Sequence, residues 1–166
     1  MSQPESDSLM DPSLGFESQT LIDILSFRRR AAGKRAMPTH GDVDPIAIGP
    51  ALLPHILLID VVHPAPFRFR WRLIGTHITR AIGRDKTGSY WDEIYDDDAL
   101  TFMRARADWV VQHKSPLRST GHASLPDRDV DVNEALHAPI SDDGKSVNMI
   151  LMGSVYSFRT EFSNPW

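Results

Sequence analysis

The stretch FRFRWRLIGTHITRAIGRDKTGSYWDEI, residues 67–94, changes its structural period within a few residues. In its first part Phe69 and Trp71 alternate with arginines, which is the two-residue period of a half-buried strand. Gly75 interrupts this alternation, and apolar residues then recur at helical spacing. The stretch therefore predicts a strand at 67–74 that passes through Gly75 into a short helix.

The size and composition of the chain favour one domain with one core. Its 166 residues are 41% hydrophobic, which is enough for a single sizeable core but not for two. The net charge of -4 argues against a nucleic-acid partner, because a nucleic-acid-binding face is usually basic. The chain has no cysteine, so it can form no disulfide, no thiolate metal site and no cysteinyl-flavin adduct.

The N-terminal region lacks the features of a secretory signal. It carries Glu5, Asp7 and Asp11 where such a signal would have a basic region followed by an apolar run. No apolar run in the chain approaches the length of about 18 residues that a membrane span needs. These features predict a cytoplasmic protein with no membrane partner.

Composition divides the chain into one domain with a tail at each end. Residues 1–18 are mostly polar and are expected to be a disordered tail. Apolar residues at helical spacing predict an amphipathic entry helix at 20–31, and basic residues at its far end suit the helix dipole. The domain runs from 19 to 158, and residues 159–166 form a C-terminal tail. The apolar stripe of the entry helix could pack on the sheet or against a second copy of the chain.

Apolar and alternating runs predict a sheet covered by helices. Acidic residues that end at Asp98 precede a strong helical period, and this helix joins the one after Gly75 in the layer over the sheet. The expected fold is α+β, a five-stranded antiparallel sheet with helices covering one face and the entry helix before it. The predicted strands are 55–62, 67–74, 117–125, 130–140 and 147–158.

Several short motifs together resemble a known family, although none of them would suffice alone. They are RLIGT at 72–76, GRDKTG at 83–88, DVDP at 42–45, LLPHILLID at 52–60 and PISDDG at 139–144. The combination resembles PAS domains and, more narrowly, short bacterial PAS proteins that carry no output domain. The resemblance implies a PAS fold, a regulatory role in signal transduction, and a ligand or partner bound on the concave side of the sheet.

We predict a mostly apolar site between the sheet and the helices that follow Gly75. Such a lining would suit a planar or fatty molecule, although the same residues could equally form an ordinary filled core. The predicted ligand-binding residues are Trp71, Ile78, Ile82, Trp91, Met103, Ala107, Glu134, Leu136, Met149 and Leu151.

Four polar or special residues are expected to have defined roles. Glu134 falls on the apolar side of its strand, so it is either a polar anchor for a ligand or a strand-end carboxylate that reaches water. Arg72, the arginine of the RLIGT motif, is expected to hold the turn at Gly75 or an acidic group such as Asp60 through charge-assisted hydrogen bonds. Alternatively, Arg72 transmits the occupancy of the site to the entry helix.

Other chemistries find little support in the spacing of the residues. A haem would need a histidine on the helical side, where His77 and His113 are the candidates, but isolated histidines near helix ends are usually hydrogen-bonded or solvated. Glu134, Asp60 or His122 could act as a base in an enzyme, yet no catalytic motif accompanies them. We expect neither haem, nor a metal, nor enzymatic activity.

The sequence thus predicts a sensory or regulatory PAS domain that binds a small, mostly apolar ligand or a regulatory protein. Binding would act by shifting a population of conformers. The alternative is an adaptor that needs no ligand and forms a homodimer through its entry helix. In that case, removal of residues 1–32 should leave a folded monomer.

Overall fold

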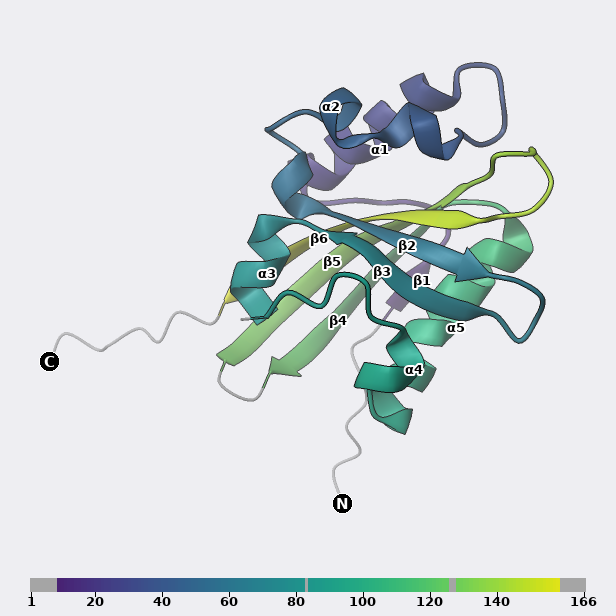
Figure 1. The fold of residues 1–166 in the computed structure, drawn as a ribbon. Helices are drawn as coiled ribbons and strands as arrows, with labels where there is room; N and C mark the ends of the chain where they lie inside the picture. The colour runs from purple at the N-terminus through teal and green to yellow at the C-terminus, as the bar shows by residue number, and fades with distance from the viewer. Residues whose placement is uncertain (1–8, 83, 126–127, 159–166) are drawn as a thin grey trace, which may run out of the picture.

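The protein folds around a single antiparallel sheet of six strands (Figure 1). The computed structural model describes residues 9–82, 84–125 and 128–158. Every neighbouring pair in the sheet is antiparallel, and the two longest strands lie side by side in its middle. In their order across the sheet, the strands are β1 (Leu9–Asp11), β4 (Leu117–Leu125), β5 (Arg128–Ile140), β6 (Met149–Phe158), β2 (Ile56–Val62) and β3 (Arg68–Ile74).

Helices cover both faces of this sheet, and each face has its own apolar core, whereas composition predicted a single core. Figure 1 shows α1 and α2 on one side of the sheet and α4 and α5 on the other. The helices are α1 (Gln19–Ala32), α2 (Pro45–Ile48), α3 (Thr76–Ile82), α4 (Trp91–Ile94) and α5 (Asp97–His113), with the 3-10 turns η1 (His40–Val43) and η2 (Leu53–His55). We call the side packed by α1 the α1 face, and the side packed by α3, α4 and α5 the α5 face. In the described part of the chain, no helix combines the length and apolar character needed to cross a membrane.

The predicted change of period at Gly75 is present and has a steric reason. β3 ends at Ile74 and α3 begins at Thr76, so Gly75 alone forms the junction. Gly75 lies directly against η2, and a Cβ atom at this position would stand 2.3 Å from the carbonyl oxygen of Pro54. Only glycine allows this approach, which fixes α3 against the turn that precedes β2.

The apolar stripe of α1 packs on the sheet. Leu21 and Ile24 are fully buried on the α1 face, and a Cβ atom on Gly153 of β6 would meet Ile24 at 2.8 Å. The side chain of Ser18 caps this helix by accepting a hydrogen bond from the amide of Leu21. Of the two surfaces predicted for the apolar stripe of α1, the sheet is therefore the one against which it packs.

The α+β class, the antiparallel sheet and the entry helix are confirmed, but the number of strands differs from the prediction. Residues 9–11 lie in the stretch for which composition predicts disorder, and they instead form β1 and pair with β4 from Leu9 to Asp11. This three-residue edge strand makes the sixth strand of the sheet. The predicted tail at 159–166 lies outside the described residues.

Candidate functional site

The α5 face brings together five of the residues predicted to bind a ligand. Trp71, Ile78, Trp91 and Ala107 are buried in its core, and Met103 packs against them. The ring centroids of Trp71 and Trp91 lie 5.1 Å apart, and the Trp71 indole Nε1 donates a hydrogen bond of 3.0 Å to the Tyr95 hydroxyl. Aromatic side chains therefore dominate the space between β3 and the short helix α4.

Three further predicted residues do not join this site. Leu136, Met149 and Leu151 belong to the core of the α1 face, on the opposite side of the sheet. Successive side chains of a strand point to opposite faces, and the residues of β6 that reach the core of the α5 face include Ile150, Met152 and Tyr156. The prediction of one continuous site is wrong in this respect. The side chain of Ile82, at the end of α3, lies outside the described part of the chain.

The buried side chain of Glu134 holds the start of α1 in place. Its carboxylate accepts hydrogen bonds from the amides of Glu17 at 3.0 Å and Ser18 at 2.8 Å, and it forms an ion pair with Arg118 at 2.7 Å. Burial alone would raise the pKa of Glu134, but the two amides and the guanidinium outweigh burial and hold the pKa below its usual value. Of the two roles predicted for Glu134, the structure shows a polar anchor, and what it anchors is the entry helix.

Three polar residues that the sequence did not single out lie on the α5 face. The side chain of His137 in β5 is buried, and its Nε2 atom lies 2.8 Å from the Ser119 hydroxyl oxygen. Burial, followed by the charge of Arg106, lowers the pKa of His137 to about 3, so this ring is neutral. Arg106 comes from α5, and its Nη1 atom donates a hydrogen bond of 2.8 Å to the carbonyl of Phe102. The alternation predicted for β5 implies that neighbouring side chains face opposite sides of the sheet, but it does not indicate which side His137 faces.

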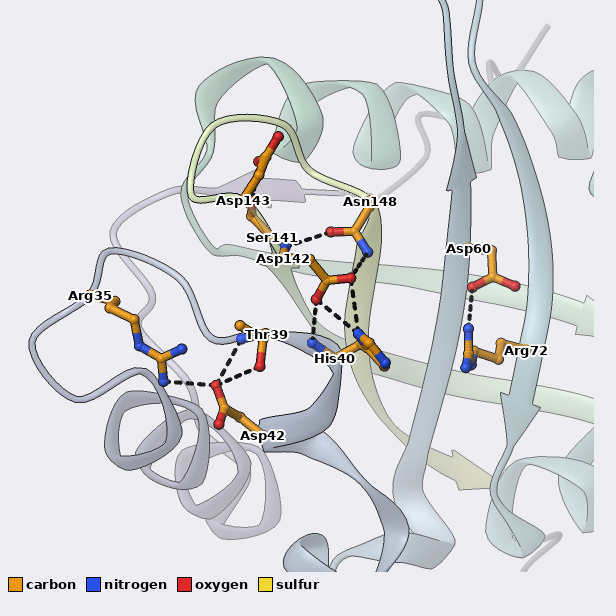
Figure 2. A network of polar contacts seen from close by, with 10 residues as sticks. All are labelled: Arg35, Thr39, His40, Asp42, Asp60, Arg72, Ser141, Asp142, Asp143 and Asn148. Carbon is orange, nitrogen blue, oxygen red and sulfur yellow. Dashed lines mark hydrogen bonds and ion pairs between the residues drawn. The ribbon is translucent and has the colours of Figure 1, made fainter.

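Asp60 is paired with arginines of β3, as predicted for Arg72. The Nη1 atom of Arg72 lies 3.2 Å from one oxygen of Asp60, while Arg70 reaches the other oxygen at 2.8 Å (Figure 2 draws the pair with Arg72). Both arginines are largely exposed, so each ion pair contributes little to stability. Gly75 lies against Leu53 and Pro54 of η2, and its amide donates a hydrogen bond of 2.7 Å to the carbonyl of Ile56.

Two of the motifs meet in the network of Figure 2. His40 approaches Asp142 with both its backbone amide and its ring Nδ1, each at 2.9 Å, and Asn148 donates to the same carboxylate at 3.1 Å. Beside them, Asp42 accepts hydrogen bonds from the Thr39 amide and hydroxyl at 2.9 Å and from Arg35 at 2.7 Å. The network ties the segment after α1 to the turn between β5 and β6.

Capping accounts for the acidic residues that precede the helices. Asp44 accepts hydrogen bonds from the amides of Ile46 and Ala47 at 2.8 and 2.9 Å, and Asp96 accepts one from Ala99 at 2.8 Å. Among the described residues, no group of three or more histidine, aspartate or glutamate side chains could hold a metal ion. These acids begin helices, as the sequence predicts.

The two histidines considered for haem have different surroundings. The ring of His77 packs on that of His55 with centroids 4.3 Å apart, and burial followed by the charge of His55 lowers the pKa of His77. His113 is exposed at the end of α5, where it stacks on Trp109 and its Nδ1 atom lies 2.8 Å from the Trp109 carbonyl oxygen. The side chain of His122 lies outside the described residues.

Comparison with known proteins places this architecture in a family. A model of the PAS domain matches residues 16–155, whereas no curated protein matches the chain. Nine solved chains match, and one of them is described as an RNA-binding Light-Oxygen-Voltage receptor. It is 15% identical, with a TM-score of 0.51 over 93% of this chain and 40% of its own length, so the likeness concerns the fold alone. On the match that spans most of its length, the chain belongs to the PAS domain family.

Proposed function

We propose that this protein is a regulatory PAS domain that binds a small, mostly apolar ligand on the α5 face. The observation that supports this proposal is the difference between the two covers of the sheet. The α1 face is closed by a helix of 14 residues whose start is held by Glu134, whereas the α5 face is covered by the 17-residue α5 together with two short helices, α3 and α4, of seven and four residues. Short helices over an aromatic surface can shift to admit a ligand at a lower cost in free energy than a helix whose start is held by hydrogen bonds.

A ligand on the α5 face would act through the sheet that both cores share. Strand β5 contributes His137 to one face and Glu134 to the other. A displacement of this strand would therefore alter the hydrogen bonds by which Glu134 holds the start of α1. The regulatory output is then a change in the position of α1. We assign no catalytic role to the site.

Native mass spectrometry of freshly purified protein tests this function. We expect an added mass that is lost on denaturation, or binding of apolar probes such as indole, measured by calorimetry. The variant Ala107→Val fills space on the α5 face and should weaken binding, whereas Ala138→Val makes the same change on the α1 face and should not. Equal binding by both variants, or no binding by the wild-type protein, would contradict the proposal.

A ligand-free adaptor that dimerises through α1 is the second candidate. The apolar stripe of α1 is used within the chain, but Ile22 leaves 38% of its surface exposed on this helix. A homodimer through α1 would bury Ile22, and Ile22→Asp should then convert it to a monomer in light scattering. Removal of residues 1–32 is no longer a clean test, because it would uncover the core of the α1 face.

The partner is proposed to be a small molecule or a protein and not a nucleic acid. The solved relative is described as RNA-binding, but the net charge of -4 in this chain disfavours binding to a polyanion. A gel-shift assay with single-stranded RNA at low salt should therefore show no complex.

A further inference from the structure

The α5 face contains a buried positive charge without a carboxylate partner among the described residues. Arg106 is 6% exposed, and its guanidinium lies under the exposed ring of Phe102, 3.6 Å from the ring centroid. Its hydrogen bond goes to the Phe102 carbonyl. On the other side of the sheet, Arg118 is paired with Glu134 and Asp11, whereas the buried Arg28 donates to a backbone carbonyl as Arg106 does. A buried charge is normally paired, because removing it from water is costly.

The neutral side chains of Ser119 and His137, on the two strands under α5, do not balance this charge. His137 lies close enough for the guanidinium to lower its pKa, and burial keeps the ring neutral. The ring is in turn hydrogen-bonded to the Ser119 hydroxyl at 2.8 Å. Helix α5 packs on both β4 and β5, which carry Ser119 and His137, so the guanidinium and the hydroxyl belong to one cluster beside the mostly aromatic and aliphatic core of the α5 face.

We infer that Arg106, Ser119 and His137 receive the carboxylate of a ligand whose apolar body packs on the aromatic part of the α5 face. This inference rests on the proposed function and specifies the ligand class as a monocarboxylic acid. The guanidinium matches the two oxygens of a carboxylate, and the Ser119 hydroxyl donates a further hydrogen bond. His137 positions that hydroxyl as the neutral tautomer with its proton on Nε2, which donates to the hydroxyl oxygen. One guanidinium balances the single charge of a carboxylate, whereas a phosphate would bring nearly two negative charges.

Matched pairs of acid and amide separate this inference from the proposed function. We would titrate octanoate against octanamide, and indole-3-acetate against indole-3-acetamide, by calorimetry. The wild-type protein should bind each acid about tenfold or more tightly than its amide, because a charge-assisted hydrogen bond exceeds a neutral one. Arg106→Gln should abolish that preference, and Arg106→Lys should retain part of it.

Arg28→Gln is the control, since Arg28 is also buried and donates to a backbone carbonyl, that of Pro139, but lies on α1. It should keep the preference for acids. If Arg106→Gln does not fold, Ser119→Ala should reduce the preference in its place. Equal binding of acid and amide by the wild-type protein would overturn the inference and leave the proposed function standing. Absence of binding by both members of every pair would overturn both.

Discussion

Acidification from about pH 7 to about pH 5 should destabilise this protein through one histidine, His137. Burial, followed by the charge of Arg106, lowers the pKa of this ring from 6.5 to about 3 in the folded chain. The unfolded chain binds a proton on the ring below about pH 6.5, whereas the folded chain does not until about pH 3. The unfolded state therefore gains protons first, and the free energy of unfolding falls as the pH falls.

The size of this effect follows from the unfolded pKa alone, because the folded pKa of about 3 lies well below the window. A pH of about 5 lies roughly 1.5 units below the pKa of the ring in the unfolded chain, and each unit corresponds to about 1.4 kcal/mol. His137 should therefore lower the free energy of unfolding by about 2 kcal/mol between these two pH values. Carboxyl groups change their charge mainly below this window and add little.

Urea unfolding of the wild-type protein and of His137→Gln at both pH values measures this effect. The amide can still bond to Ser119 but does not titrate, so the loss on acidification should be smaller in the variant by about 2 kcal/mol. His77, whose pKa is also lowered, is present in both proteins and cancels in the comparison. An identical loss in wild type and His137→Gln would refute the reasoning.

Three further substitutions have expected outcomes in urea unfolding at neutral pH. Gly75→Ala should cost about 2 kcal/mol or more, because its Cβ would lie 2.3 Å from the Pro54 carbonyl oxygen; an unchanged midpoint would mean that η2 yields easily. Glu134→Gln should cost about 3 kcal/mol, since it leaves the buried Arg118 with only the longer ion pair to Asp11, and adding Arg118→Met should recover part of this loss. Asp44→Ala removes the cap of α2 and should cost about 1 kcal/mol; no loss would show that the cap is dispensable.

Local patterns predicted most of the elements of the fold. The alternation before Gly75, the apolar stripe of α1 and the aspartates at helix starts each depend on neighbours in sequence, and each is present in the structure. β1 was missed because three residues in a polar context carry no readable period. Its position depends on pairing with β4, more than 100 residues later in the chain.

The candidate site was only partly predictable, for a related reason. Both faces of β5 and β6 are buried, so apolar residues occur at odd and even positions alike, and their spacing does not indicate which core each one joins. Glu134 was recognised as unusual, but its partners Glu17 and Ser18 lie more than 110 residues earlier. Arg106 resembles any helical arginine until tertiary structure buries it.

Because two cores share one sheet, the side chains of β5 can report on events in both cores. From Glu134 to Ala138, even-numbered side chains face α1 and odd-numbered ones face α5. In an NMR titration with a ligand, resonances that shift at odd positions only would show that the effect of binding is confined to the α5 face. Shifts that reach the even positions would show that the event has crossed the sheet, so adjacent residues on a single strand can separate occupancy from response.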